Sequence, residues 1–367
     1  GLVTDRVFRI VEQPGGSLWL ATHDGVFRLT EQADSFAFSR YHSEGPAGRK
    51  MSYNFVNDLV PQGKNRLWAA TYRGGVNEFL LEEDSGQNIR IKHHRTSSGA
   101  PGSLGSEEIS TVLPDDQGLL WVATNRHVEV GKRSEENFRT VGEINEAGYG
   151  LESLVCKVPY IDRFGNLWVG HNNGLSFLSA ANRLAGIYRF RHYVHDDNDP
   201  YSLSDNNVAN ITEDKQGNLW VVTKKGGLNY TRLRDFADHE KFQLLNKNGL
   251  KDYNLVSDIV EYTPGEYYVA SSHGFALMTF SGGDTSTFKA SYFKMSDRIE
   301  GPQELDPGIV NSSSRGIHQD RFGDYWVGTF AGVARVRVIE GETLFDNYIS
   351  EPGRSGSLSN NSFRCFF

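Results

Sequence analysis

The sequence predicts an all-β fold, a seven-bladed β-propeller of four-stranded antiparallel blades. One phrase, close to D-x-x-G-x-L-W-V-G-T-x-x-G-G, recurs seven times in 367 residues, at spacings of 47 to 58 residues. A period near this length is typical of stacked supersecondary units. Each period has room for four short strands, and no stretch longer than about ten residues shows helical periodicity. The aromatic residues at the centres of the copies are Trp19, Trp68, Trp121, Trp168, Trp220, Tyr268 and Trp326.

The centre of each copy is a strand that we expect to be buried on both faces. In the third copy, Leu120 and Val122 flank Trp121. Side chains alternate along a strand, so the two aliphatic residues share one face and the tryptophan takes the other. Both faces are apolar, which predicts cover on both sides and a buried aromatic residue. The next residue, Ala123, is small, and we expect a bulky side chain of a neighbouring blade to fill that gap.

Turn residues mark both ends of this strand. Gly118 stands three residues before the aromatic position, and Asn65 replaces it in the second copy. Both residue types tolerate positive φ, which predicts a hairpin turn there. Asp115 lies at the mouth of the same turn, and glycines such as Gly174 mark a second turn after the strand. A strand with a Val-x-x-Ile pattern, such as 208–211, precedes the first turn, and two less regular strands follow the second, all joined by short turns.

The blades account for residues 1–355. Residues 357–363, SLSNNSF, repeat residues 202–208, SLSDNNV, which lead into the first strand of a blade. We therefore expect residues 356–367 to begin an eighth repeat, in which case the parent chain continues. The alternative is that they pair locally and close the ring.

Composition and motifs exclude several classes of function. A net charge of −8 and a pI near 5.8 argue against a nucleic-acid or anionic-membrane partner. No apolar run is long enough for a transmembrane helix. Cys156 and Cys365 fall in predicted first strands without metal-type spacing, which indicates free thiols. No H-E-x-x-H, G-x-S-x-G or phosphate-loop motif occurs, so we expect no catalytic residue, no bound metal and no cofactor.

Two polar clusters have simpler explanations than metal binding. The run 196–199, DDND, lacks the spacing of a calcium loop and is expected to be a solvated turn. The pair His93-His94 lies in a predicted outer strand, where an exposed pair is the simpler interpretation.

The repeat resembles the two-component regulator propeller repeat. The fullest match is at residues 190–229, where F-x-H-Y-x-H-D-x-x-D-P-x-S-L-S-x-N-x-V precedes D-x-x-G-N-L-W. The resemblance implies a non-catalytic, ligand-sensing segment in the bacterial periplasm, part of an inner-membrane protein. Its output domain, a histidine kinase or a diguanylate cyclase, would lie outside this segment. The chain departs from the pattern in blade 6, which lacks the aspartate and the tryptophan, and at His127, Pro159 and His171.

The tips of the turns after the aromatic strands are the predicted ligand site. These positions vary while the surrounding scaffold repeats, and function generally lies on loops held by a rigid scaffold. In a propeller these turns share one face. Their aromatic, amide and basic groups suit a polar or anionic ligand, and blades 2 to 5 supply the cations, which predicts an off-centre site. The candidate residues are Tyr72, Arg73, Asn125, Arg126, Asn172, Asn173, Lys224, Lys225, His273 and Phe330.

Three functions remain open at this point. The leading one is the sensor segment, with an unknown small molecule or oligosaccharide as ligand and with further blades or domains of the parent chain as partners. The second is an enzyme similar to streptogramin lyase, which would need a His/Glu cluster holding a divalent metal. The third is a scaffold for dimerisation or interaction, and a homodimer is left open. For any single candidate residue, the alternative explanation is that the turn tip varies only because nothing constrains its sequence.

Overall fold

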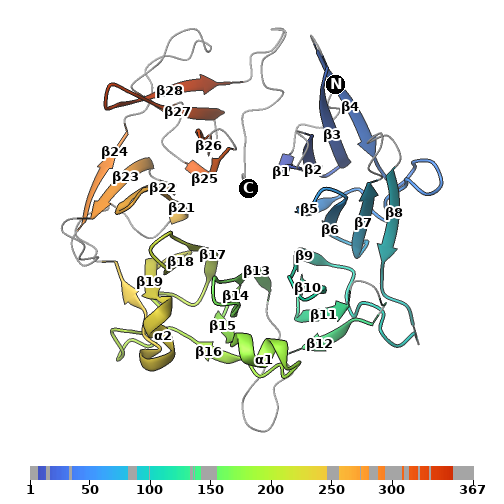
Figure 1. Cartoon of the computed structure of the whole chain (residues 1–367), viewed down its shortest axis with the longest axis horizontal. Helices are drawn as coiled ribbons and strands as arrows, with labels where there is room; N and C mark the ends of the chain where they lie inside the picture. Colours follow the sequence, from blue (N-terminus) through green and yellow to red (C-terminus); the bar gives the residue numbers. More distant parts are fainter. Residues whose placement is uncertain are drawn as a thin grey trace. The chain divides into compact units, whose positions relative to one another are not determined.

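The computed structural model describes residues 7–13, 17–32, 35–81, 89–98, 100–132, 135, 137–141, 155–245, 256–272, 274–280, 288–293, 308–309, 314–320, 323–329 and 332–349. In these residues the chain is a seven-bladed β-propeller of four-stranded antiparallel sheets, which confirms the predicted fold class (Figure 1). It divides into two compact units, residues 1–192 and 193–367. Unit 1 holds blades 1 to 4 and unit 2 holds blades 5 to 7, with the boundary in the last strand of blade 4.

The strands of each blade pair in chain order. The blades of unit 1 are blade 1, β1 (Val7–Glu12), β2 (Leu18–Thr22), β3 (Gly25–Gln32) and β4 (Ser35–Tyr41); blade 2, β5 (Val56–Gln62), β6 (Arg66–Thr71), β7 (Val76–Leu81) and β8 (Ile89–His94); blade 3, β9 (Ile109–Pro114), β10 (Leu119–Thr124), β11 (Val128–Lys132) and β12 (Arg139–Val141); and blade 4, β13 (Cys156–Ile161), β14 (Leu167–His171), β15 (Gly174–Leu178) and β16 (Arg191–Tyr193).

Unit 2 follows the same plan. Its blades are blade 5, β17 (Val208–Glu213), β18 (Asn218–Thr223), β19 (Gly227–Arg232) and β20 (Gln243–Leu244); blade 6, β21 (Val256–Thr263), β22 (Glu266–Ser271), β23 (Gly274–Phe280) and β24 (Phe288–Tyr292); and blade 7, β25 (Ser314–Gln319), β26 (Tyr325–Thr329), β27 (Val333–Ile339) and β28 (Glu342–Tyr348).

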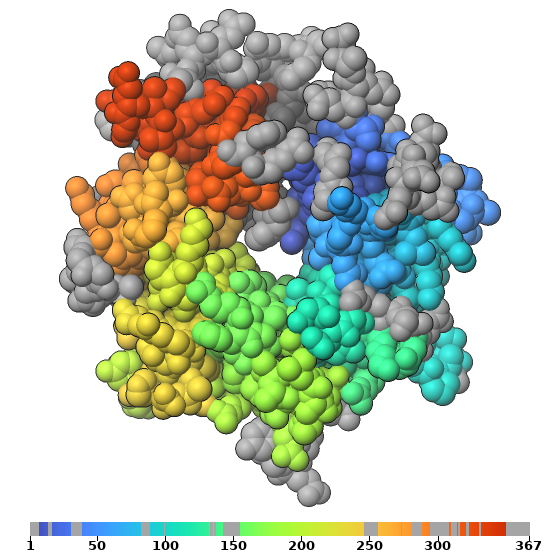
Figure 2. Space-filling view, viewed as in Figure 1, coloured from blue at the N-terminus to red at the C-terminus, as the bar shows by residue number. Residues whose placement is uncertain are grey.

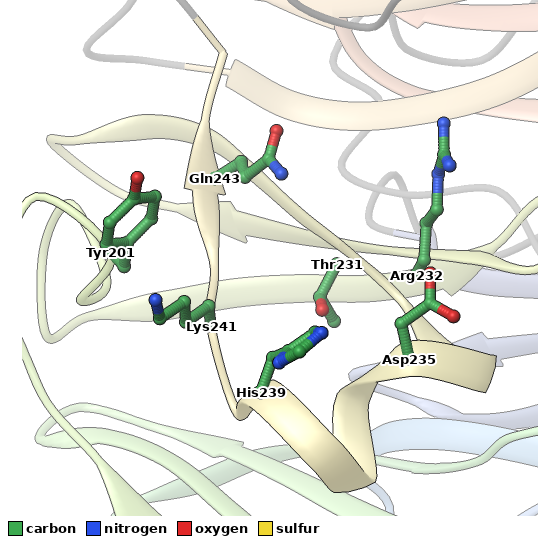
Figure 3. A pocket seen from close by; sticks show the side chains of 7 residues that line it. All are labelled: Tyr201, Thr231, Arg232, Asp235, His239, Lys241 and Gln243. Atoms are coloured by element: carbon green, nitrogen blue, oxygen red, sulfur yellow. The ribbon is translucent and has the colours of Figure 1, made fainter.

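In the described residues two short helices interrupt this plan, so the prediction that short turns join all strands is wrong in blades 4 and 5. The helices α1 (Ala180–Leu184) and α2 (Leu233–His239) lie between the third and fourth strands of these blades. The Ser179 side chain caps α1 by accepting a hydrogen bond from the Asn182 backbone N–H at 3.3 Å. Figure 3 shows α2 beside the short strand β20. Helices of five and seven residues are too short to show a periodic apolar face.

The repeated aspartate explains the spacing of the repeated phrase. Asp162 Oδ1 accepts hydrogen bonds from the backbone N–H groups of Phe164 and Asn166, both at 2.9 Å, and so closes the first turn. Its Oδ2 accepts from Trp168 Nε1 at 2.8 Å. A carboxylate six residues before the indole therefore holds both the turn and the aromatic strand. The same indole bond is made by Trp121 to Asp115, by Trp220 to Asp214 and by Trp326 to Asp320.

The glycines act mostly where the sequence predicted, with one error. Gly118 has a φ of 81°, as expected for the first turn. In the first turn of blade 2 the residue with positive φ is Gly63, at 59°. Asn65 does not have a positive φ, so its predicted role is wrong. The two glycines of the second turn in blade 2, Gly74 and Gly75, are needed for different reasons. Gly75 takes a φ of 69°, while a Cβ on Gly74 would lie 2.6 Å from the Ser52 hydroxyl oxygen.

A bulge near the start of the first strand recurs in all seven blades and was not predicted. In each unit, one buried carboxylate just after a bulge joins three successive blades. In unit 1, Asp58 Oδ1 lies 3.0 Å from Arg9 Nε, and the Thr111 hydroxyl donates to Oδ2. In unit 2, Asp258 accepts from Asn210 Nδ2 at 2.8 Å and from the Ile317 backbone N–H at 2.9 Å. Burial raises the pKa of Asp258 to about 7 despite these donors.

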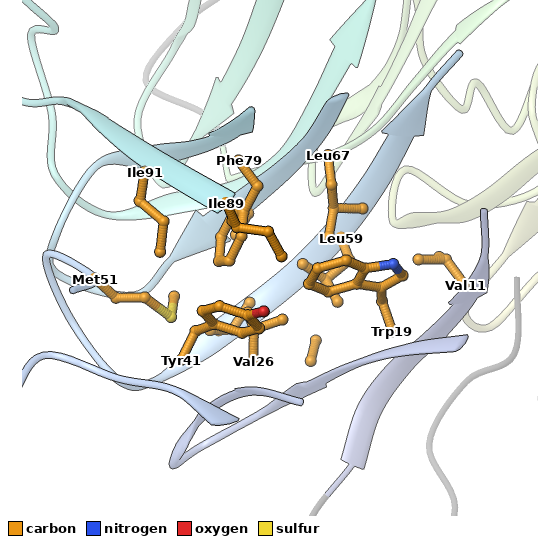
Figure 4. Packing of buried hydrophobic residues seen from close by; sticks show 13 residues of the cluster. Val11, Trp19, Val26, Tyr41, Met51, Leu59, Leu67, Phe79, Ile89 and Ile91 are labelled. Carbon is orange, nitrogen blue, oxygen red and sulfur yellow. The ribbon is translucent and has the colours of Figure 1, made fainter. Parts of the chain in front are cut away.

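The core lies between successive blades, as the alternating faces predicted. Trp19 is fully buried and packs edge-on against Phe79 of blade 2, with ring centroids 5.8 Å apart, in a cluster with Leu59 and Leu67 (Figure 4). The small Ala21 shares that cluster with side chains of β5. Within each unit, the aromatic face of a blade thus covers the aliphatic face of the next blade. Blades 2 and 3 lie side by side (Figure 2), and their facing residues form a cluster of the same kind.

Other predictions about buried residues can now be compared with the structure. Five of the six tryptophans are at most 1% exposed, whereas Trp326 is only partly buried. Cys156 is a buried free thiol in the first strand of its blade, as expected, and burial raises its pKa to about 12. Cys365 and the whole segment 356–367 lie outside the described residues, so both interpretations of that segment stay predictions.

Candidate functional site

In six of the seven blades the turn tips are held by the threonine or serine that ends the aromatic strand, a role that the sequence reasoning missed. In blade 2 the Thr71 hydroxyl donates to the Gly75 carbonyl at 2.8 Å and accepts from the Gly74 backbone N–H at 2.9 Å. The hydroxyl therefore bridges the two ends of the turn. The hydroxyl bond to the carbonyl recurs at Thr22, Thr124, Thr223, Ser271 and Thr329.

The tip backbone is fixed while its side chains face solvent. The Tyr72 N–H donates to the Phe55 carbonyl at 3.0 Å, and the Lys224 N–H donates to the Asn207 carbonyl at 2.8 Å. Each acceptor directly precedes the first strand of the same blade. Of the described candidates, Asn125 is partly buried and the others are exposed, namely Tyr72, Arg73, Arg126, Asn172, Asn173, Lys224 and Lys225. His273 and Phe330 lie outside the described residues.

The structure brings together three of the predicted residues in unit 1. Arg73 lies over the Tyr72 ring, with its guanidinium carbon 5.1 Å from the ring centroid. Arg73 Nε is 4.0 Å from Glu108 Oε1, and the Asn125 amide donates a hydrogen bond to the same carboxylate. We define Tyr72, Arg73, Glu108 and Asn125 as the tip cluster of blades 2 and 3. It combines a half-exposed ring, a cation, a carboxylate and an amide.

Glu108 changes the charge expected at the tips. Aromatic, amide and basic groups were predicted there, and the structure adds a carboxylate that stands between Arg73 and Asn125. In blade 5 the Asp205 carboxylate accepts from the Lys225 backbone N–H at 3.2 Å, so acid also lies beside that tip. Glu108 could have been found from the sequence by its place directly before the first strand, because that position is paired with the tip. The predicted site residues themselves stay a prediction.

An aromatic row leads away from the tip cluster toward blade 1. The Tyr72 ring, 41% exposed, lies 5.4 Å from the Phe55 ring, and Phe55 lies 4.9 Å from Phe8 of β1. The side chain of Asn125 keeps one buried oxygen, Oδ1, without a hydrogen-bond partner among the described residues. The exposed ring is a surface on which a ligand can stack, whereas the Asn125 oxygen is buried and out of a ligand's reach in this conformation.

In blade 4 a histidine stands where the other blades have threonine or serine. His171 is 2% exposed, and its Nδ1 accepts from the Asn173 backbone N–H at 3.3 Å, so Nε2 carries the proton. Nε2 donates to Ser176 Oγ at 2.8 Å, and that hydroxyl donates to His192 Nδ1 at 2.8 Å. Burial and the nearby His192 lower the pKa of His171 to about 4. Ser176 is fully buried, so this relay fixes the turn and offers no nucleophile to a substrate.

This histidine should make blade 4 sensitive to acid. Its folded pKa lies below the ordinary value of 6.5, so stability is fully present above pH 6.5 and is lost as the pH falls toward 4. Between pH 6.5 and 5 the loss should be roughly 2 kcal/mol, at ~1.4 kcal/mol for each pH unit. The variant His171→Thr, which restores the residue of other blades, should lack this loss. Urea unfolding at both pH values measures it, and equal pH slopes for the two proteins would contradict the assignment.

The connector before blade 5 explains the remaining residues of the repeated phrase. The Ser204 backbone N–H donates to Asn229 Oδ1 at 2.9 Å, and Asn229 Nδ2 donates to Ser204 Oγ at 2.8 Å. Residues 196–199 form an exposed turn, as predicted. His195 Nδ1 bonds the Leu203 carbonyl at 2.6 Å, and this bond raises the pKa of His195.

In blade 2, His93 is partly exposed and His94 is buried against Glu78, so the expected exposed pair is wrong for His94.

No metal site is evident in the part of the chain that the structure describes. No group of three or more His, Cys, Asp or Glu side chains is close enough there to hold an ion. None of the described helices has the length and hydropathy needed to span a membrane.

Comparison with known families supports the resemblance inferred from the repeats. Residues 103–126 and 202–225 match the family model described as two component regulator propeller. Both segments begin at a connector serine and end at the second residue of a turn tip, Arg126 or Lys225. The resemblance is therefore confirmed at these two repeats. A search of curated proteins finds no match.

Solved structures share the fold. The extracellular domain of a putative hybrid two-component system from B. thetaiotaomicron superimposes with a TM-score of 0.64 and 21% identity, covering 98% of this chain and 43% of that one. The present chain thus spans less than half of that domain's length. YCF48 from Cyanidioschyzon merolae gives a TM-score of 0.55 at 14% identity, covering 95% of each chain. Catalytically inactive virginiamycin B lyase from Staphylococcus aureus, with quinupristin, gives 0.55 at 9%, covering 94% of this chain and 96% of the lyase.

Proposed function

We propose that this chain is the extracytoplasmic, ligand-sensing segment of a membrane-bound signal-transduction protein, and that it is not itself catalytic. The observation that carries the proposal is the pair of family matches, which include the connector, the aromatic strand and the turn tip of blades 3 and 5. The structural likeness to the extracellular domain of a putative hybrid two-component system, over 98% of this chain, supports it. A periplasmic location and an output kinase or cyclase are parts of the same proposal.

The turn tips are the proposed recognition surface. Their backbones are fixed by the threonine bridges, while Tyr72, Arg73 and Arg126 present aromatic and basic groups to solvent. In the tip cluster, Glu108 and Asn125 add acceptors and donors beside Arg73. A ligand with both anionic and hydroxyl groups would be complementary to this mixed surface. A small molecule or an oligosaccharide has this chemistry.

The test is signalling by the intact parent protein after paired substitutions at the tips. We expect Arg73→Ala/Arg126→Ala to shift the stimulus response by about tenfold or more, the effect of losing one charge-assisted hydrogen bond. Lys224→Ala/Lys225→Ala is the same test for blade 5. Phosphotransfer or cyclic dinucleotide production is the readout.

The matched control is Lys132→Ala/Lys289→Ala, which removes the same charge from exposed positions away from the tips. Circular dichroism and thermal unfolding check that each variant is folded. Unchanged signalling in folded tip variants would place recognition elsewhere in the parent chain. A stoichiometric divalent metal in the purified chain, together with lyase or hydrolase activity, would replace the sensor proposal with an enzyme.

A further inference from the structure

Aromatic rings gather in unit 1, where the tip of blade 2 meets the connector that precedes β5. Tyr72 of the tip and Tyr53 of the connector are exposed, and Phe55 of the connector is partly exposed. A Cβ added to Gly74 of the tip would lie 2.5 Å from the Tyr53 Cβ, so the connector and the tip are in close contact. A contiguous exposed apolar surface of this kind is typical of a binding site.

Three of the rings form a row that continues into blade 1. Phe55 lies 5.4 Å from Tyr72 and 4.9 Å from Phe8 of β1, at interplanar angles of 51° and 34°. A flat ligand can therefore contact more than one ring at the same time. Contacts between aromatic rings add to the free energy gained from burying apolar area.

A guanidinium with unused donors stands beside this row. The guanidinium carbon of Arg73 lies 5.1 Å from the Tyr72 centroid, and the Arg73 side chain is 61% exposed. Its Nε is 4.0 Å from Glu108 Oε1, which is longer than a hydrogen bond. Among the described residues the Arg73 side chain makes no hydrogen bond, so its planar fork of N–H groups can bind a carboxylate at two points.

Glu108 limits the charge that a ligand can carry there. Its carboxylate accepts a hydrogen bond from the Asn125 amide and stands 4.0 Å from Arg73 Nε. A ligand with one acid group can pair with Arg73, whereas a second acid group beside the first would be repelled by Glu108. The balance of charge in the tip cluster therefore favours a single carboxylate.

We propose that the tip cluster of blades 2 and 3 binds a small aromatic carboxylate, a planar ring with one acid group. Arg73 would hold the acid, and the ring would pack against Tyr72 and Phe55. The 5.1 Å between the guanidinium carbon and the Tyr72 centroid lets both anchors contact one small molecule. The inference rests on the proposed function, because it names the ligand class of the same turn tips. The rings lie on the exposed surface, so we expect a dissociation constant near roughly 1 mM.

Blade 5 supplies a comparison, a second tyrosine beside a cation. A cavity of about 450 Å³ lies there beside β20, which pairs only with Asn229 and Tyr230 of β19 and leaves the end of that strand uncovered (Figure 3). Lys241 Nζ lies 4.5 Å from the centroid of the Tyr201 ring, which is 45% exposed. No second ring contacts Tyr201 among the described residues, and an ammonium group cannot form the two-point pair of a guanidinium. We therefore expect no comparable binding in blade 5.

Ligand-observed NMR on the purified chain tests the proposal with 2-naphthoate as the probe. Decahydro-2-naphthoate keeps the acid and loses the aromatic ring, and 2-naphthalenemethanol keeps the ring and loses the acid. We expect saturable binding of 2-naphthoate, about fivefold weaker binding of the saturated acid and at least about tenfold weaker binding of the alcohol. Naphthalene-2,3-dicarboxylate, with two adjacent acids, should also bind more weakly than 2-naphthoate.

Two variants with matched controls locate the site. Arg73→Gln should weaken the binding of 2-naphthoate about tenfold or more, whereas Arg90→Gln, the same change at an exposed arginine of β8, should leave it unchanged. Tyr72→Leu should weaken it about fivefold, whereas Tyr201→Leu should not. All four side chains are exposed, so the variants should fold, as circular dichroism will verify.

Glu108→Gln gives a test in the opposite direction. The variant removes the competing acid and keeps an acceptor for the Asn125 amide, so it should bind 2-naphthoate more tightly, by about threefold or more. Equal binding of 2-naphthoate and its saturated analogue, equal losses in Arg73→Gln and Arg90→Gln, or no saturation up to about 20 mM would each overturn the proposal. Failure of the sensor proposal is a separate result, namely unchanged signalling by folded Arg73→Ala/Arg126→Ala in the parent protein.

Discussion

Replacing Trp220 with alanine should lower the free energy of unfolding by about 3–5 kcal/mol. The indole is 1% exposed and lies among three rings, Tyr230, Tyr267 and Phe280, with centroids 5.2, 5.1 and 5.9 Å away. Removing it opens a cavity between blades 5 and 6 that these rings cannot fill. It also removes the indole N–H that donates a hydrogen bond to Asp214 Oδ2 at 2.9 Å.

Urea unfolding followed by circular dichroism measures this loss, and the chain supplies a matched control. Trp326 has the same repeat position and the same bond to aspartate, at 2.9 Å, but is only partly buried. Trp326→Ala should therefore cost roughly half as much, because less apolar surface leaves the core. Equal losses for the two variants would mean that the aspartate bond, and not burial between blades, dominates the role of the aromatic residue.

The second large effect is expected at a buried ion pair between blades 3 and 4. Arg183 of α1 is 3% exposed; its Nη1 lies 2.7 Å from Asp115 Oδ2, and its Nε donates to the Gly165 carbonyl at 2.9 Å. Asp115 also holds the indole of Trp121. Arg183→Met leaves this carboxylate buried without its cation, which should cost about 3–5 kcal/mol.

Blade 5 offers a comparison in which the partner is neutral. There Asp214 accepts from the Tyr267 hydroxyl of blade 6 at 2.7 Å. Tyr267→Phe should cost only about 1–2 kcal/mol, because one hydrogen bond is lost and no charge is stranded. The double variant Asp115→Asn/Arg183→Met should recover part of the loss of Arg183→Met. If Arg183→Met costs no more than Tyr267→Phe, the ion pair contributes nothing beyond an ordinary hydrogen bond.

The sequence predicted those parts of the fold that repeat. The alternation of Leu120, Trp121 and Val122 predicted both faces of the second strand, because burial on two sides constrains every position. The aspartate and glycine positions predicted the first turn in most blades for the same reason. At Asn65 the prediction was wrong, since a glycine two residues earlier supplies the positive φ.

The features that single blades add were not predictable in this way. The helices α1 and α2 and the two-residue strand β20 are too short to show a repeating hydrophobic pattern of their own, so the sequence does not reveal them. Glu108 was missed for a different reason: the position directly before the first strand was not recognised as the partner of the turn tip. The cavity beside β20 depends on the length of one strand and not on any residue type, so no motif marks it.

The way in which neighbouring blades are joined has a consequence for how the chain folds. Within each unit, the bonds that join successive blades connect residues of similar separation in the chain, such as 53 residues for Thr111 and Asp58, 59 for Ile317 and Asp258, and 68 for Arg183 and Asp115. The entropy lost on closing a loop grows only with the logarithm of its length, so each of these closures costs nearly the same. Neighbouring blades can therefore assemble pairwise from several starting points, and a further blade adds one more closure of the same kind without lengthening any earlier one.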